Sequence, residues 1–376
     1  MIAHIVLGLG FGDEGKGSMV DYLVSKQKQN SIVIRFSGGQ QCGHTVIRNG
    51  IKHVFSNCGS GSLQNVPTYF SEHTSIYLNT LFNEKKLLNE KGIDPVLYVH
   101  PLTKLTTPYD VAYNRLNARK KGHVSCGLGI GTTMNRSLTT PYKLYAIDSN
   151  NKNFFFERLK VIKNYYLSLF EGNPIEINAF LLECVEHEKE FIGTIDEKLF
   201  EIKNYDFLKG FENLIFEGSQ GIMLDMDHGI FPYVTYANTT SKNAIEICNK
   251  LNLSDIDRRN FIYNTYYVTR CYQTRHGEGW MSNEKELNLV NNNEEINILN
   301  EYQGNFRIGE IDYDLLNQSI LIDQIYNKSI DFNLVITCLD HRPNFKFDYG
   351  KIKNIERFGV YNSESPIGEK IFIERY

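Results

Sequence analysis

The chain begins with MIAHIVLG (Met1–Gly8) and continues with LGFGDEGKGS (Leu9–Ser18). The first part is a nearly unbroken apolar run, as expected of a strand that is covered on both faces. The second part is a glycine-rich turn that leads into a segment with helical periodicity. A strand, a glycine-rich turn and a helix, in that order, place backbone N–H groups and a helix N-terminus where they can hold phosphate.

This turn is similar to a P-loop but departs from it in two ways. The glycine spacing around Lys16 is that of a P-loop, yet Gly17 stands where the motif has serine or threonine. Asp13 and Glu14 would lie beside bound phosphates, where like charges repel each other unless a metal ion intervenes. We therefore expect a carboxylate of this pair to act as a metal ligand or as a proton acceptor.

A second glycine-rich loop, RFSGGQQCGHT (Arg35–Thr45), follows the next predicted strand. Its glycines indicate a backbone that lies close to a ligand. His44 in this loop is of a type suited to donating a proton near neutral pH. A lone histidine in a turn is more often a structural residue, so the residue pattern alone leaves both interpretations of His44 open.

Short apolar strands alternate with longer helical segments along the chain. The predicted strands are His4–Leu9, Ser31–Phe36, Val96–His100, Leu214–Glu217, Thr265–Tyr272 and Asn333–Leu339. The predicted helices span residues 15–27, 75–91, 107–120, 154–171, 176–190, 240–251 and 311–326. This alternation predicts an α/β fold with a large central, mostly parallel sheet flanked by helices and a P-loop-like phosphate loop after the first strand. We expect one domain over residues 1–376, with surface insertions near 147–153 and 284–299.

Composition excludes several classes of protein. The chain has 40 basic and 44 acidic side chains and a formal charge of −4, whereas a general nucleic-acid binder needs a surplus of lysine and arginine. No apolar run approaches the roughly 20 residues that cross a bilayer, and the N-terminus lacks a secretory pattern, so we expect no membrane partner. Seven scattered cysteines without a paired spacing favour reduced thiols in the cytoplasm and argue against a zinc module.

Further motifs follow in a collinear order. They are Phe216–Gly229 (FEGSQGIMLDMDHG), Pro232–Thr235 (PYVT), Asn238–Thr240 (NTT), Thr274–Gly279 (TRHGEG) with Glu284, and Thr337–Asp340 (TCLD). Together with the two glycine-rich loops, they closely resemble the motifs of the adenylosuccinate synthetase family. The resemblance covers most of the chain.

The resemblance implies an enzyme that couples cleavage of a nucleoside triphosphate, usually GTP, to the joining of L-aspartate to carbon 6 of a purine nucleotide. The 6-oxygen is first phosphorylated, because oxide is a poor leaving group, and the amine of aspartate then displaces phosphate. Asp13 matches the base that removes the N1 proton, and His44 matches the general acid that stabilises charge on O6 and on the transferred phosphoryl group. Lys16 holds the triphosphate and completes this catalytic set.

The resemblance also implies a set of binding residues. Those expected at the triphosphate are Gly12, Glu14, Gly15, Lys16, Gly17, Gly43, Thr45 and Asp340. Those expected at the purine nucleotide are Gln41, Cys126, Gln220, Thr235 and Arg275, and Arg307 is expected at aspartate. Mg²⁺ is the expected cofactor, held by Asp13 and the Gly43 carbonyl. Asp225, Asp227 and His228 are interpreted as a structural turn rather than as metal ligands.

Four departures from the family pattern bear on selectivity. The aspartate loop, which usually carries several consecutive arginines, has only Arg307 within residues 303–309, although one guanidinium can clamp one carboxylate. Cys338 replaces the lysine that packs over guanine, so GTP and ATP are both open as donors. Cys126 replaces a threonine contact, and Gln41 replaces an asparagine.

Three functions therefore stay open. The first is a ligase that uses IMP. The second is a viral branch of the family that makes 2-aminoadenylosuccinate from dGMP, with ATP as donor; many members of that branch replace the base with serine, and the retained Asp13 favours IMP. The third is a non-catalytic nucleotide sensor.

The expected partners are a purine nucleoside monophosphate, L-aspartate, and GTP or ATP. The resemblance also implies a homodimer in the cytoplasm, or in the host cytoplasm if the protein is viral. In the family an arginine crosses from the neighbouring subunit to the substrate phosphate, and Arg136 is the candidate for it here.

Overall fold

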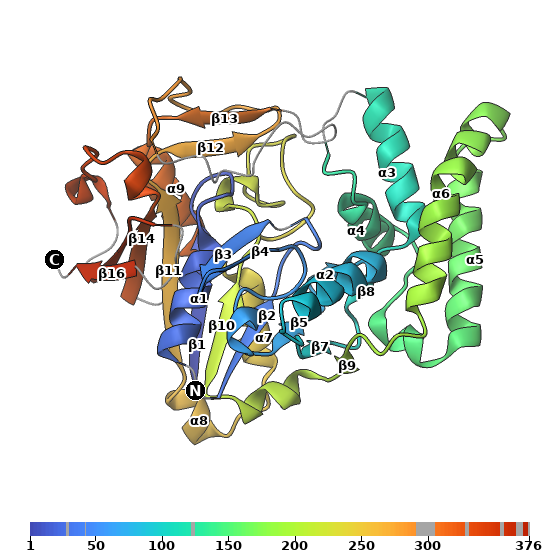
Figure 1. Ribbon diagram of the computed structural model, residues 1–376, viewed down its shortest axis with the longest axis horizontal. Helices are drawn as coiled ribbons and strands as arrows, with labels where there is room; N and C mark the ends of the chain where they lie inside the picture. The colour runs from blue at the N-terminus through green and yellow to red at the C-terminus, as the bar shows by residue number, and fades with distance from the viewer. Residues whose placement is uncertain are drawn as a thin grey trace.

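The structure, a computed structural model, describes residues 1–27, 30–41, 43–121, 125–290, 305–327, 331–353, 357–365 and 371–374. Its centre is a ten-stranded sheet in the order β16-β15-β14-β11-β1-β10-β2-β5-β7-β9 (Figure 1). These strands are β1 (Ile2–Gly8), β2 (Ser31–Arg35), β5 (Thr68–Phe70), β7 (Leu97–Val99), β9 (Glu201–Ile202), β10 (Asn213–Glu217), β11 (Ile262–Arg270), β14 (Asp331–Thr337), β15 (Arg357–Ser363) and β16 (Ile371–Glu374). Neighbouring strands pair in parallel, except that β16 pairs antiparallel with β15.

The helices cover both faces of this sheet. They are α1 (Lys16–Lys26), α2 (Leu78–Glu90), α3 (Pro108–Lys121), α4 (Ile130–Thr139), α5 (Lys152–Ser168), α6 (Pro174–Thr194), α7 (Lys242–Lys250), α8 (Asp255–Arg259) and α9 (Tyr313–Asp323). Met19 of α1 clusters with Val6 on one face of the sheet. Ile247 of α7 and Ile320 of α9 cluster with Ile5 on the other face. Because β1 is buried on both sides, its sequence is an unbroken apolar run instead of an alternating one.

Helices α3 to α6 form a lobe beside the sheet, at the right of Figure 1. Its core contains Phe155, Phe180 and Phe191, which are almost completely buried. None of the described helices is long and apolar enough to span a membrane.

Two short hairpins lie near the carboxyl ends of the central strands. They are β3 (His44–Arg48) with β4 (Ile51–Phe55), and β12 (Gln273–His276) with β13 (Phe306–Gly309). In Figure 1 the second hairpin lies at the top, beyond the end of β1. A further short parallel pair is β6 (Ser75–Ile76) with β8 (Lys104–Leu105). The short 3₁₀ turns are η1 (Ser62–Gln64), η2 (Ala146–Asn150), η3 (Tyr205–Gly210), η4 (Ile222–Leu224), η5 (Leu339–His341) and η6 (Tyr349–Lys351).

The predicted α/β fold is confirmed, and each predicted strand and helix overlaps an observed one. The stretch 147–153 is mostly exposed and forms η2 and the start of α5, with the Asp148 side chain buried against the backbone N–H of Tyr145. Residues 284–290 are irregular and mostly exposed, as predicted, and 291–299 lie outside the described residues. That the chain forms one domain, and that these stretches are insertions, stay predictions.

A buried histidine in β1 predicts that stability depends on pH. His4 is 2% exposed, and burial lowers its pKa from 6.5 to about 4, against a hydrogen bond with Asn213 that raises it. His4 therefore becomes protonated below pH 6.5 in the unfolded chain, but only below about pH 4 in the folded chain. We expect His4 to contribute up to about 3 kcal/mol above pH 6.5 and to lose it as the pH falls toward 4.

Urea unfolding of wild type and His4→Gln at pH 7 and pH 4.5 measures this contribution. The other buried histidines titrate in both proteins, so the difference between the two pH slopes isolates His4. An equal slope in the two proteins would contradict the assignment.

Candidate active site

The phosphate loop lies at the carboxyl end of β1 and is held against β14. Gly15 caps α1 with a φ of 89°, and a Cβ at this position would lie 2.9 Å from the Thr337 side chain. The Thr337 hydroxyl donates a hydrogen bond to the Glu14 carbonyl at 2.8 Å. Glycine is therefore required at Gly15 both by the left-handed backbone and by the close approach of β14. The first turn of α1 follows directly, as the sequence predicts.

Lys16 and Glu14 form a buried ion pair inside this loop. The Lys16 Nζ lies 3.2 Å from Glu14 Oε2, and the two residues are 2% and 4% exposed. Glu14 Oε1 also accepts a hydrogen bond from the Gly10 backbone N–H. Burial raises the pKa of Glu14 even though the Lys16 charge lowers it. The cation predicted to hold phosphate is therefore engaged by the carboxylate of its own loop.

Asp13 is held by residues at the end of β11 and in β12. Its Oδ2 lies 2.9 Å from His276 Nε2, and the Arg270 guanidinium donates a hydrogen bond to the Asp13 carbonyl. The Thr274 hydroxyl donates to the Gly12 carbonyl at 2.9 Å. Burial alone would raise the pKa of Asp13, but His276, with Arg270 and Lys16, outweighs it and the pKa lies below its usual value. Asp13 is therefore ionised at neutral pH, as a base must be.

His44, at the start of β3, is held by a carboxylate that the sequence analysis did not single out. Its Nδ1 lies 2.6 Å from Glu217 Oε1, at the end of β10. Glu217 is completely buried and also accepts a hydrogen bond from the Ser60 N–H at 2.9 Å and pairs with Arg35 at 3.4 Å. Burial would raise the pKa of Glu217, but Arg35, His44 and Ser60 lower it to about 2.

Because ionised Glu217 can only accept, His44 must donate from Nδ1, and Nε2 is left for a ligand. Burial lowers the pKa of His44, and the opposing effect of Glu217 does not restore it, so the ring is neutral at pH 7. A Cβ on Gly17 would lie 2.8 Å from the His44 Cβ. The first turn of α1 and the start of β3 are thus in contact, which brings His44 beside the phosphate loop.

Two predicted purine contacts, Gln41 and Gln220, have buried amide oxygens with no hydrogen-bond partner among the described residues. A Cβ on Gly12 would lie 3.5 Å from the Gln220 Cα, so Gln220 lies against the phosphate loop. A Cβ on Gly38 would lie 3.0 Å from the Gln41 amide nitrogen. Buried acceptors are nearly always satisfied in proteins, so the contact of these two side chains with a ligand stays a prediction.

The loop after β10 has the structural role that the sequence predicts for its carboxylates. Asp225 is buried and accepts hydrogen bonds from the backbone N–H groups of Asp227, His228 and Thr239 at 2.9, 3.2 and 2.6 Å. The same loop places Thr235, whose N–H donates to the Leu224 carbonyl at 2.8 Å. A contact of the Thr235 side chain with nucleotide stays a prediction.

The structure gives the positions of Cys126, Gly43, Thr45 and Asp340, and their contacts with nucleotide stay predictions. Cys126 is half-buried just before the glycines that begin α4. Gly43 is exposed, and Thr45 lies one residue after His44 in β3. Asp340 lies in η5, which begins directly after Cys338, and the φ of 57° at Cys338 turns the chain at the end of β14.

Three arginines of the predicted set interact with groups of their own chain. Arg136 is 1% exposed and forms two hydrogen bonds of 2.8 Å with Asp110, so the prediction that it crosses to a neighbouring subunit is wrong. Arg275 is 2% exposed, stacks over Phe11 at 4.4 Å and donates to the backbone carbonyls of Glu278, Trp280 and Tyr233, and a contact with nucleotide stays a prediction. Sequence does not reveal that an arginine is already engaged within its own chain.

Arg307 is paired with a carboxylate of its own chain. Its Nε donates to Glu284 Oε1 at 2.7 Å, and its Nη2 contacts the other oxygen of the same carboxylate. Its Nη1 donates to the carbonyls of Gly277 and Gly279 at 3.0 and 2.7 Å. The fork predicted to bind aspartate thus holds one carboxylate bidentately, which is the geometry that the prediction requires. Aspartate must replace Glu284 to use it.

The divalent metal that the family resemblance implies fits the phosphate loop by its chemistry. The Asp13 side chain is 24% exposed, and each carboxylate oxygen has two lone pairs, so Asp13 can offer one lone pair to a metal ion besides the one that accepts a proton. Mg²⁺ is commonly held by one or two carboxylates together with substrate phosphates rather than by a protein cage. In agreement, Asp13 belongs to no preformed cluster of metal-ligating side chains among the described residues.

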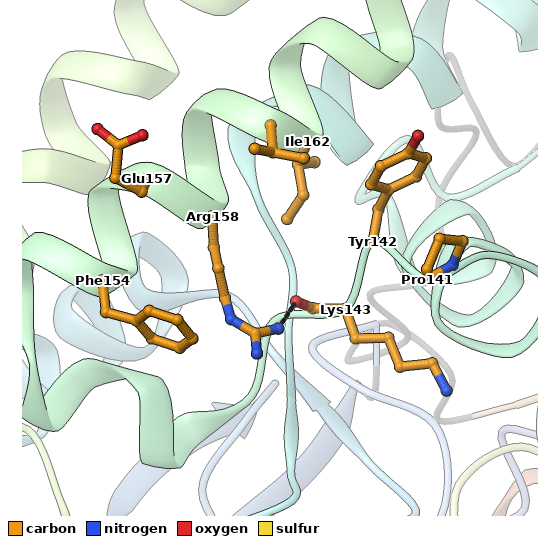
Figure 2. A pocket seen from close by; sticks show the side chains of 8 residues that line it. Pro141, Tyr142, Lys143, Phe154, Glu157, Arg158 and Ile162 are labelled. Atoms are coloured by element: carbon orange, nitrogen blue, oxygen red, sulfur yellow. Dashed lines mark hydrogen bonds between the residues drawn. The ribbon is translucent and has the colours of Figure 1, made fainter.

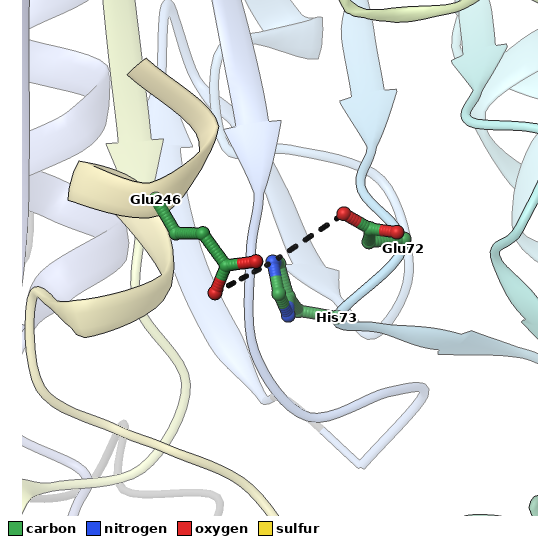
Figure 3. A group of neighbouring side chains, drawn as sticks. All are labelled: Glu72, His73 and Glu246. Carbon is green, nitrogen blue, oxygen red and sulfur yellow. Dashed lines mark ion pairs between the residues drawn. The ribbon is translucent and has the colours of Figure 1, made fainter. Parts of the chain in front are cut away.

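Such a cluster is formed by other residues: Glu72, His73 and Glu246 lie together, as Figure 3 shows. Lys250 Nζ lies 2.6 Å from Glu72 and 2.6 Å from Glu246. The two carboxylates therefore already share a cation of the protein, and the cluster is an ion-pair network.

The lobe also carries an apolar hollow, shown in Figure 2, between α5 and the segment before η2. Phe154 and Ile162 line it, and Arg158 donates to the Lys143 carbonyl at 2.6 Å across it. It contains none of the predicted catalytic residues, so it is separate from the candidate site.

The sequence model of the adenylosuccinate synthetase family matches residues 5–346. The chain belongs to the adenylosuccinate synthetase family. This family consists of carbon–nitrogen ligases of purine biosynthesis that bind nucleotides, so the resemblance seen in the sequence motifs is confirmed.

Curated relatives match most of the chain. The adenylosuccinate synthetase of Clostridium perfringens is 30% identical over 299 residues, which are 76% of this chain and 66% of that protein. That of Buchnera aphidicola is 31% identical over 285 residues, which are 73% of this chain and 63% of that protein. The matched region of the chain thus spans somewhat less than two thirds of the length of these relatives.

Solved structures share the fold over the whole chain. The fully ligated adenylosuccinate synthetase of Plasmodium falciparum has a TM-score of 0.69 at 18% identity, covering 100% of this chain and 99% of that one. The succinoaminodeoxyadenylate synthetase of cyanophage S-2L, bound to dGMP and to dATP as an energy donor, has a TM-score of 0.64 at 16% identity, covering 98% and 94%.

Proposed function

We propose that this chain is a ligase that joins L-aspartate to carbon 6 of IMP, driven by cleavage of a nucleoside triphosphate. One observation carries the proposal: the ionised Asp13 carboxylate and the Glu217-held His44 imidazole both lie at the phosphate loop after β1. A base for the purine N1 proton and a donor for the phosphoryl transfer are the two groups that the reaction needs beside the triphosphate.

In the first step Asp13 accepts the N1 proton, so that O6 becomes a nucleophile and attacks the terminal phosphorus of the triphosphate. A bond forms between O6 and phosphorus, and the nucleoside diphosphate leaves. Negative charge on the triphosphate favours protonation of His44 at Nε2, and Glu217 stabilises the resulting imidazolium through Nδ1. Mg²⁺, when bound, supplies neutralisation of the phosphate charge.

In the second step the amine of aspartate attacks carbon 6. A C–N bond forms, the bond between carbon 6 and the phosphorylated oxygen breaks, and inorganic phosphate leaves. We assign one carboxylate of aspartate to Arg307, in place of Glu284. Gln41 and Gln220 are assigned to the purine nucleotide because their buried amide oxygens lack partners among the described residues.

A second candidate acceptor is dGMP, with ATP as donor. It is favoured by Cys338 in place of the guanine-packing lysine and by the single arginine near residue 307. The retained Asp13 favours IMP, since many members of the dGMP-using branch carry serine there. The homodimer and the cytoplasmic location stay predictions from the family resemblance.

The test is a matrix of IMP, dIMP, GMP and dGMP against ATP and GTP, each with aspartate and Mg²⁺. We expect phosphate release and the absorbance of a succinylated purine, with the highest kcat/KM for IMP. A higher kcat/KM for dGMP establishes the second candidate. Tight binding of nucleotide without turnover in any combination would contradict a ligase and leave a nucleotide sensor.

A further inference from the structure

His276 contacts the proposed base directly, although it occupies a position that the family motif leaves open. Its Nε2 lies 2.9 Å from Asp13 Oδ2, and the two side chains are 20% and 24% exposed. A carboxylate has two oxygens, and a general base needs one of them directed at the proton that it removes. Engagement of Oδ2 by His276 leaves Oδ1 for the substrate.

The backbone explains why Asp13 needs an external restraint. Its φ is 58°, in the left-handed region that residues with a side chain seldom adopt. The main chain around it is fixed by Arg270, which donates to the Asp13 carbonyl, and by Thr274, which donates to the Gly12 carbonyl. These bonds fix the loop, but they do not fix the direction of the carboxylate.

His276 is itself well supported. It ends β12, where it pairs with Phe306 of β13, and the two rings have centroids 5.1 Å apart. The next pair in the same ladder is Arg275 with Arg307. The histidine is therefore part of a short ribbon that reaches from the base to the residue assigned to aspartate.

We propose that His276 is a positioning residue, whose Nε2–H holds Asp13 Oδ2 so that Oδ1 faces the N1 proton of the purine. This inference rests on the proposed function and adds to it the residue that orients the base. In this role His276 donates a hydrogen bond from Nε2 to Asp13 Oδ2, and its imidazole does not change protonation during the reaction.

Substitutions of His276 distinguish a role as hydrogen-bond donor to Asp13 from a role that needs only a side chain of similar size. The amide nitrogen of glutamine falls close to the place of Nε2, whereas that of asparagine falls near Nδ1 and does not reach Asp13. We expect His276→Ala and His276→Asn to lower kcat by about 10²-fold, the usual effect of misplacing a reacting group by about 1 Å. We expect His276→Gln to recover kcat to within about 5-fold of wild type, with KM for both nucleotides nearly unchanged in all three.

His73→Ala is the matched control. His73 has a side-chain exposure of 18%, close to that of His276, and also pairs with carboxylates, but it lies in the Glu72–Glu246 network. We expect its kcat to equal that of wild type. If His276→Ala does not fold, the Gln and Asn variants, which are close in size to histidine, carry the comparison.

Crystal structures of the same variants give a readout that does not need turnover. We expect the Asp13 side chain to leave its rotamer in His276→Ala and His276→Asn and to keep it in His276→Gln. An unchanged Asp13 in His276→Ala, or equal kcat in the Gln and Asn variants, overturns the inference. If wild type turns over no acceptor, the proposed function fails while the rotamer comparison still decides the role of His276.

Discussion

Asp13→Asn lowers kcat by about 10³- to 10⁴-fold, the upper part of the range for loss of a general base. Asparagine has the size of aspartate and can still accept the hydrogen bond from His276, so the loop keeps its shape. It cannot take a proton from N1, and O6 of the purine stays a poor nucleophile. Steady-state rates with IMP, aspartate and either triphosphate give kcat, and calorimetry gives nucleotide affinity, which we expect to change only a few-fold.

Asp227→Asn is the control for this substitution. Asp227 lies in the loop after β10, pairs with Lys242 at 2.8 Å and does not contact the phosphate loop residues described above. We expect it to retain wild-type kcat. An Asp13→Asn protein with kcat within 10-fold of wild type would remove Asp13 from the role of base.

Glu217→Gln is expected to lower both stability and rate. Glu217 is completely buried between Arg35 and His44, so its loss leaves a buried guanidinium without its counter-charge. Breaking a buried pair of this kind costs about 3–5 kcal/mol of unfolding free energy. Because the carboxylate also orients His44 and stabilises its charged form, we expect kcat to fall by about 10²-fold as well.

Asp110→Asn separates these two effects. Asp110 pairs with the buried Arg136 in the helical lobe, away from the phosphate loop. We expect a similar loss of stability in urea unfolding and a kcat close to that of wild type at a temperature where both variants are folded. Equal kcat values for Glu217→Gln and Asp110→Asn would show that Glu217 acts on stability alone.

The stability that Glu217 contributes also has a defined pH range. Its folded pKa of about 2 lies below the ordinary value of 4.5, so the contribution is present above pH 4.5 and is lost as the pH falls toward 2. The His4 contribution is lost at higher pH, between 6.5 and 4. As the pH falls, we therefore expect the protein to lose the stability contributed by His4 first and that contributed by Glu217 afterwards.

The strands and helices of the fold could be predicted from the sequence because each is marked by the spacing of its apolar residues. The strand, turn and helix around the phosphate loop could be predicted because an apolar run, a set of closely spaced glycines and an amphipathic segment each have one simple structural meaning. Helix α4 was not predicted because its first turn follows closely spaced glycines, which favour turns. The edge strand β16 was missed because it has only four residues, and β15 was missed because glycine and polar residues interrupt its apolar pattern, RFGVYNS.

The candidate site was predicted in part, and the misses share a cause. Asp13, Lys16 and His44 lie in motifs, but Glu217 and His276 act through contacts between distant parts of the chain, which spacing does not encode. The only sequence feature that pointed to His276 was its position directly after Arg275, within a motif of the family. The arginines at 136, 275 and 307 were assigned to ligands, whereas the structure pairs each with groups of its own chain.

The path of the 6-oxygen tests the mechanism most directly. IMP and dGMP labelled with ¹⁸O at position 6 are each incubated with aspartate, Mg²⁺ and triphosphate, and the released phosphate is analysed by mass spectrometry. If Asp13 activates O6 and the phosphoryl group moves onto it, the label appears in inorganic phosphate, one atom for each purine converted. Succinylated purine formed together with unlabelled phosphate would contradict activation of that oxygen.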